Sequence, residues 1–117
     1  MKTVRLILAG VLVMQLTVLA NCKKDQSVPD CIQKKIEAMK NEPVRNPPGS
    51  VWRYSYKGRT VYYIPAQCCD QYSELYDDQC NLLCHPDGGF TGKGDGTCTD
   101  FATAATGKTE VWTDPRK

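Results

Sequence analysis

The chain has 117 residues, with 15 Lys and Arg against 13 Asp and Glu, 41% hydrophobic residues and seven cysteines. This length suits one small domain and leaves little room for a buried active site. The formal charge of +2 comes from Lys2 and Arg5 at the N-terminus. The remainder is therefore neutral, which argues against a nucleic-acid partner.

The N-terminus has the pattern of an export signal. After Lys2 and Arg5, the run LILAGVLVMQLTVLA (residues 6–20) is shorter than the about 20 apolar residues of a membrane-spanning helix. The following Leu-Ala-Asn-Cys sequence, which ends at Cys22, resembles a bacterial lipobox. In that pattern the cysteine receives a diacylglycerol and becomes the new N-terminus. The alternative is secretion after plain cleavage behind Ala20.

We therefore predict a lipoprotein signal peptide at residues 1–21, a lipidated tether at 22–26 and a single disulfide-rich domain at 27–117. Two or three acyl chains hold a protein firmly to a membrane. Lys23, rather than Asp, follows the cysteine, which resembles the sorting signal for the outer membrane of a Gram-negative cell. The leaflet is left open.

The first predicted element is a helix. Ser27 is placed to cap it, with Pro29 in the first turn and Asp30 completing a capping box, and Pro43 ends it. Apolar residues recur at helical spacing and form one stripe, which consists of Val28, Ile32, Ile36 and Met39.

The sequence VWRYSYKGRTVYYI (residues 51–64) predicts a β-hairpin around Lys57-Gly58. A two-residue turn places Trp52, Tyr54, Val61 and Tyr63 on one face, whereas a three-residue loop places Tyr62 and Ile64 there instead of Val61 and Tyr63. The sequence leaves this choice open.

The remaining elements are short. Residues 72–76 and 81–84 predict a second hairpin, and the glycine-rich segment 85–97 predicts a loop. Asp100 to Thr106 fits a short helix ended by Gly107, and Lys108 to Trp112 fits a last strand. We expect an α+β fold, with one N-terminal helix packed on a small antiparallel sheet and held by disulfides.

Lipidation of Cys22 leaves six cysteines, which can pair completely in an oxidising compartment: Cys31, Cys68, Cys69, Cys80, Cys84 and Cys98. Neighbouring cysteines such as Cys68 and Cys69 rarely bond to each other. We predict a Cys31–Cys80 bridge, with Cys68 and Cys69 bonded to Cys84 and Cys98 in either order.

The remaining polar residues do not form a recognisable metal or catalytic motif. Cys80, Cys84 and His85 lack the spacing of a zinc site, and we expect no metal and no cofactor. Calcium binding by Asp87, Asp95 and Asp100 stays open, although no EF-hand spacing is present. His85 is the sole histidine and lacks an evident nucleophile. The chain is therefore expected not to be an enzyme.

A binding role has more support. A rigid, disulfide-bonded loop that presents Phe90 and Lys93 would bind a partner at little ordering cost. Many small protease inhibitors work in this way, so inhibition by the 85–97 loop is the alternative function. The aromatic face of the first hairpin is a third candidate, as a platform for a saccharide or a protein, although core packing is the simpler explanation of it.

From Pro43 to Arg116 the chain resembles a family of small bacterial lipoproteins known only as a domain of unknown function. The residues that carry the resemblance are Asn46-Pro47-Pro48, Val61-Tyr62-Tyr63, Cys68-Cys69-Asp70, Leu75-Tyr76-Asp77, the stretch CHPDGGFTGKGDG (residues 84–96), Trp112 and Asp114-Pro115-Arg116. The resemblance implies an exported, lipid-anchored domain and brings no activity with it. We therefore expect an outer-membrane lipoprotein with a binding or structural role in the cell envelope.

Overall fold

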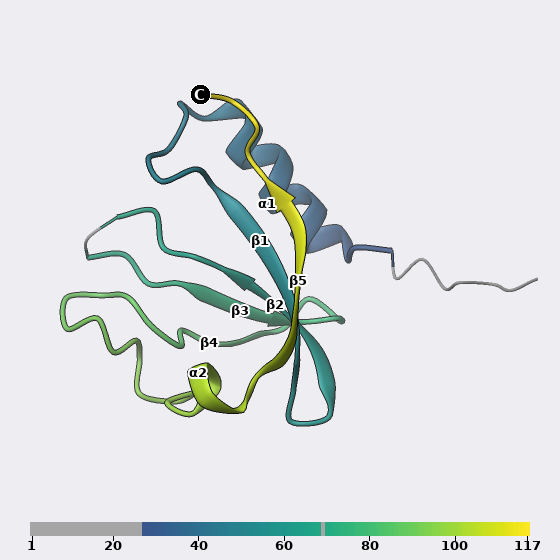
Figure 1. Ribbon diagram of the computed structural model, residues 1–117, viewed down its shortest axis with the longest axis vertical. Helices are drawn as coiled ribbons and strands as arrows, with labels where there is room; N and C mark the ends of the chain where they lie inside the picture. The colour runs from purple at the N-terminus through teal and green to yellow at the C-terminus, as the bar shows by residue number, and fades with distance from the viewer. Residues whose placement is uncertain (1–26, 69) are drawn as a thin grey trace, which may run out of the picture.

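The computed structural model describes residues 27–68 and 70–117 and has the predicted α+β architecture (Figure 1). In chain order the elements are α1 (Asp30–Asn41), β1 (Ser50–Tyr56), β2 (Arg59–Ile64), β3 (Glu74–Asp77), β4 (Leu82–Cys84), α2 (Phe101–Ala104) and β5 (Thr106–Thr113). The strands form an antiparallel sheet in the order β4-β3-β2-β1-β5. The predicted signal peptide and tether lie outside the described residues. Neither described helix is long and apolar enough to cross a membrane.

Helix α1 begins later than predicted. Pro29 is its N-cap, and the Pro29 carbonyl accepts hydrogen bonds from the amides of Ile32 and Gln33, each at 2.9 Å. No side chain caps the helix, so the predicted cap by Ser27 is wrong. The backbone of Pro29 already has the fixed φ that a helix start requires, two residues after the serine. The helix ends at Asn41, before Pro43, as expected.

The first hairpin has a two-residue turn. Lys57 and Gly58 have φ values of 49° and 75°, which is the left-handed pair of a type I′ turn. Tyr54 therefore pairs with Val61, and Trp52 with Tyr63. This is the first of the two registers that the sequence left open.

Side-chain alternation along the strands gives the sheet two apolar faces. On the face toward α1, Val51, Tyr62 and Ile64 form a core cluster with Ile32, Ile36 and Met39 of the helix. On the opposite face, Tyr56, Val61, Leu75 and Cys84 form a second cluster with Phe101 of α2. Tyr54 and Tyr63 lie on this second face, with their ring centroids 5.2 and 5.5 Å from that of Phe101. Most of the aromatic face of the hairpin is thus engaged in packing.

The C-terminal elements differ from the prediction at Gly107. Helix α2 ends at Ala104, and Ala105 is extended. Gly107 lies in β5 with φ 65°, where the pairing of β5 with β1 shifts register between Arg53 and Ser55. Gly107 therefore permits the irregular backbone at this point of the strand. Its predicted role as a helix terminator is wrong.

The predicted Cys31–Cys80 disulfide is present and joins α1 to the turn between β3 and β4. Cys84 and Cys98 bond to each other, so the prediction that they pair with Cys68 and Cys69 is wrong. The chain folds back after β4, and the Cys84 and Cys98 Cα atoms are 6.1 Å apart.

The other two predicted disulfide cysteines lie next to each other between β2 and β3. Cys68 is also disulfide-bonded. Cys69 lies outside the described residues.

The segment after β5 contacts the C-terminal end of α1, and Figure 1 shows the two side by side. The Arg116 guanidinium donates to the carbonyl oxygens of Met39 and Glu42, at 2.9 and 3.0 Å, and pairs with the Asp114 carboxylate at 2.7 Å. These bonds reinforce the C-terminal end of α1, where the Met39 carbonyl otherwise accepts only the 3.3 Å hydrogen bond of the Glu42 amide.

Candidate functional site

The candidate site is the glycine-rich loop, residues 85–97, between β4 and α2. The Cys84–Cys98 disulfide closes its base. Above the disulfide, the Asp95 amide donates to the His85 carbonyl at 2.9 Å, and the Gly94 amide donates to the Gly88 carbonyl at 3.0 Å. The loop is therefore ordered by its own backbone.

The loop is also bonded to the segment before β3. The Gly89 amide donates to the Gln71 carbonyl at 2.8 Å, and the Ser73 amide donates to the Asp87 carbonyl at 3.2 Å. A Cβ atom on Gly88 would lie 2.5 Å from the Gln71 oxygen. Glycine at this position allows the two backbones to approach each other.

His85 has a structural place in this arrangement. Its Nδ1 lies 2.7 Å from the Ser73 carbonyl oxygen, so this nitrogen carries the proton and donates it. Its ring stacks on that of Tyr72, with 5.0 Å between the centroids. The Ser73 hydroxyl is fully buried and donates to the backbone of Asp87, not to the histidine. Ser73, His85 and Asp87 are neighbours, but they do not form the nucleophile–base pair of a hydrolase.

The three candidate calcium ligands point to different partners. The Asp87 carboxylate accepts a hydrogen bond from the Tyr63 hydroxyl at 2.7 Å. Asp95 accepts from the amide and hydroxyl of Thr97, and these bonds lower the pKa of the Asp95 carboxyl. Asp100 accepts from Tyr56. Within residues 27–68 and 70–117, no group of His, Cys, Asp and Glu side chains could hold a metal.

The Tyr63–Asp87 hydrogen bond anchors the loop to the sheet. Burial of the Tyr63 side chain raises the pKa of Tyr63, and the hydrogen bond to Asp87 raises it further. The tyrosine therefore stays protonated and keeps donating to the carboxylate throughout the physiological range.

Phe90 lies at the tip of this rigid loop. It is 91% exposed, the largest exposed fraction among the exposed large hydrophobic residues of the described chain. The Gly92 amide donates to the Gly89 carbonyl at 3.1 Å, so Phe90 and Thr91 occupy the centre of a tight turn. Lys93 is exposed beside this turn. The two residues predicted as the binding loop are thus both presented to solvent.

Tyr72 was missed as part of this surface. It is 48% exposed, and a Cβ atom on Gly89 would lie 2.4 Å from its ring. The sequence gives no local signal for this contact, because it depends on the pairing of Tyr72 with Gly88 across the loop. Phe90, Lys93 and Tyr72 are called the loop surface below.

In a comparison with protein families, residues 37–114 match a family described as a domain of unknown function (DUF6970). The chain belongs to the DUF6970 family. No curated protein and no solved structure matches the chain. The match covers α1 from Glu37, the whole sheet and the loop surface, so all of these are features of the DUF6970 domain. The resemblance to an uncharacterised domain is confirmed, and the lipoprotein character of the chain stays a prediction.

Proposed function

We propose that this DUF6970 protein is a lipid-anchored, non-enzymatic binding module of the bacterial cell envelope. In this proposal Cys22 carries the lipid, and Lys23 favours the outer membrane. The loop surface binds a protein partner. The observation that carries the proposal is the 91% exposure of Phe90 on a loop that is fixed by a disulfide and by hydrogen bonds.

A partner that covers the Phe90 ring would remove a large apolar surface from water, which is favourable. The fixed loop supports such an interface, because a preformed loop loses little conformational entropy on binding. Aromatic anchors supply much of the energy of protein interfaces. Lys93 adds a positive charge beside the ring, and it makes no ion pair within the described residues. A partner with an apolar pocket and a nearby carboxylate fits this surface.

The position of the loop in the fold agrees with an anchor at Cys22. Helix α1 begins on one side of the domain, and the yellow-green glycine-rich loop lies on the opposite side (Figure 1). A lipid attached ahead of α1 would therefore leave the loop surface directed away from the membrane. The partner would be a protein of the aqueous compartment or one that extends into it.

The shape of the loop favours docking over protease inhibition. An inhibitor that enters a protease as a substrate mimic presents an extended segment that pairs like a β-strand. Phe90 instead lies within a tight turn. Stoichiometric inhibition of a protease that is lost in Phe90→Ala would overturn this preference and assign the inhibitor function.

The anchor is tested by the intact mass of the protein purified from bacterial membranes. We expect a chain that begins at Cys22 and carries acyl groups, and a Cys22→Ala variant without acyl groups that leaves the membrane fraction. A membrane-free wild-type chain with an unmodified Cys22 would contradict the proposal.

The binding role is tested by photo-crosslinking in envelope preparations, with a photoreactive amino acid in place of Thr91. We expect one major crosslinked protein, whose yield falls at least about tenfold in Phe90→Ser, because the aromatic anchor is lost. Leu82→Ser is the matched control, since Leu82 is a 48% exposed apolar residue outside the loop. Equal yields in the two variants would rule out Phe90 as the anchor.

A further inference from the structure

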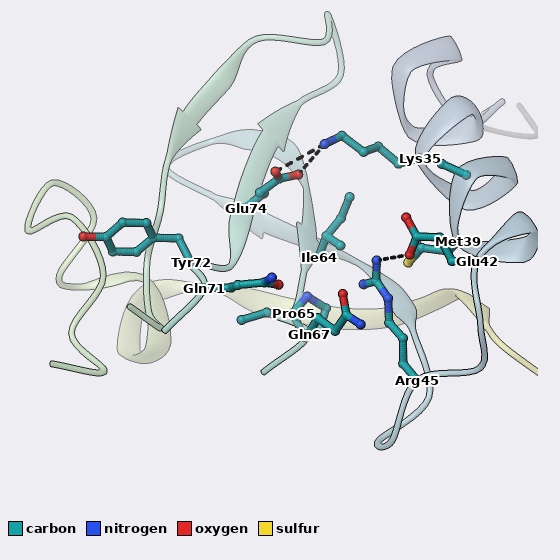
Figure 2. A pocket seen from close by; sticks show the side chains of 12 residues that line it. Lys35, Met39, Glu42, Arg45, Ile64, Pro65, Gln67, Gln71, Tyr72 and Glu74 are labelled. Carbon is teal, nitrogen blue, oxygen red and sulfur yellow. Dashed lines mark hydrogen bonds and ion pairs between the residues drawn. The ribbon is translucent and has the colours of Figure 1, made fainter. Parts of the chain in front are cut away.

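A second surface of the domain has the chemistry of a small-ligand site. A groove of about 210 Å³ lies between α1 and residues 64–74, and Figure 2 shows it from close by. It does not include the tip of the glycine-rich loop. One wall is α1, and Ile64 and Pro65 give the groove an apolar floor.

Arg45 lines this groove and carries one donor that is unused. Its side chain is only 16% exposed and pairs with Glu42 through Nη2 at 2.7 Å. Its Nε is buried and has no hydrogen-bond partner. A buried N–H without an acceptor is costly, so a small shift of the Arg45 side chain that brings this N–H to a ligand oxygen would be favoured.

Two amide side chains add to this unused capacity. Gln67 and Gln71 line the same groove, and neither side chain makes a hydrogen bond within the described residues. Each amide offers two donor hydrogens and one acceptor oxygen. Figure 2 shows Gln67 beside the Arg45 guanidinium and Gln71 further along the same wall.

The charges that line the groove balance. Lys35 pairs with Glu74 at 2.9 Å, and Arg45 pairs with Glu42, so two positive and two negative groups are present. The ion pair with Glu74 helps to raise the pKa of Lys35 against the effect of its partial burial, and the lysine stays charged. An anionic ligand would meet both glutamates and a cationic ligand both basic groups. The lining therefore favours a neutral ligand.

We propose that this groove binds a neutral saccharide unit. A sugar hydroxyl both donates and accepts hydrogen bonds, which matches the mixture of amide, guanidinium and carboxylate groups. The C–H face of a sugar ring fits the apolar floor of Ile64 and Pro65. The volume suits a single ring, such as one unit of a glycan chain. This site shares Tyr72 with the loop surface but not Phe90 or Lys93, and it does not depend on the function proposed for that surface.

The test is a titration of the ¹⁵N-labelled full-length protein, in a detergent without a sugar headgroup, with glucose, galactose, mannose and N-acetylglucosamine. We expect at least one of these sugars to shift the side-chain amide signals of Gln67 and Gln71 and the Nε signal of Arg45, with a Kd of about 1 mM. Absence of shifts at these three side chains with all four sugars would overturn the proposal.

Charged sugars and variants sharpen this test. At about pH 6 the amine of glucosamine is protonated. Tighter binding of glucuronate or glucosamine than of glucose would overturn the neutral ligand class.

The Gln67→Ala variant should bind the sugar about tenfold more weakly, because one or two hydrogen bonds are lost. Gln33→Ala, on the exposed side of α1, should leave the affinity unchanged. Equal effects of the two variants, both with native-like spectra, would place the sugar outside the groove.

Discussion

Gly94 lies so close to the backbone of His85 that no side chain fits there. A Cβ atom at Gly94 would be 2.0 Å from the His85 carbonyl oxygen, whereas a Cβ atom at Gly92 would meet nothing within 4 Å. Both glycines have positive φ, 68° and 73°. The two positions therefore separate the cost of backbone conformation from the cost of close packing.

We predict that Gly92→Ala lowers the free energy of unfolding by about 1 kcal/mol, the cost of a left-handed alanine. Gly94→Ala should cost about 3 kcal/mol, since the loop must also move away from His85. Chemical denaturation of the two variants measures the difference. Equal losses would mean that the loop is not packed as described.

At the scale of elements, the turn between β3 and β4 is organised around one carboxylate. Asp77 is 6% exposed, and it accepts hydrogen bonds from the Asn81 side chain and from the amides of Gln79 and Asn81. Burial opposes ionisation of Asp77, but these hydrogen bonds outweigh burial and lower its pKa from the ordinary value of 3.8. The ionised form therefore stabilises the folded turn.

The stability contributed by Asp77 should be present above pH 3.8 and be lost as the pH falls through the lower pKa of the folded state, because the unfolded chain takes up the proton first. Asp77→Asn should flatten the acid side of the stability curve, whereas Asp78→Asn, at an exposed neighbour, should leave its shape unchanged. Thermal unfolding from about pH 5 down to about pH 2 measures this. A variant as acid-sensitive as the wild type would contradict the assignment.

Sequence patterns predicted elements well where the signal was local. Lys57-Gly58 and the alternation around it identified the first hairpin, because turn chemistry and side-chain period agree there. Local patterns failed at Ser27, because the helix begins at Pro29 instead. They also failed at Gly107, because pairing with β1 determines the backbone conformation there. The loop surface was predicted at Phe90 and Lys93 from glycine content, whereas Tyr72 and the groove at Arg45 depend on contacts between distant segments.

At the scale of the whole molecule, the thin core is held by disulfides, and the two whose partners are both described differ in span. Cys31–Cys80 joins residues 49 positions apart, and Cys84–Cys98 joins residues 14 apart. In the chain-entropy model these bridges contribute about 4 and about 3 kcal/mol. The sequence predicted the long bridge, but the short one required knowledge of how residues 85–97 fold back.

We predict that Cys31→Ala combined with Cys80→Ala lowers the unfolding free energy by about 4 kcal/mol and leaves the loop surface intact. Cys84→Ala combined with Cys98→Ala should cost about 3 kcal/mol and, in addition, abolish crosslinking through the loop surface. Chemical denaturation and the Thr91 crosslinking yield separate the two effects. Undiminished crosslinking in the second double variant would show that the disulfide is not needed to shape the loop.

In chain order β5 is the last of the described strands, yet it pairs with β1, the first strand of the sheet. Arg116, which follows it, holds the carbonyl end of α1. A nascent polypeptide that stops before residue 106 would therefore lack both the outer neighbour of β1 and the residue that fastens the helix. Products that stop there should expose an unpaired strand and be open to proteolysis, so that only chains that extend past Arg116 acquire the native fold.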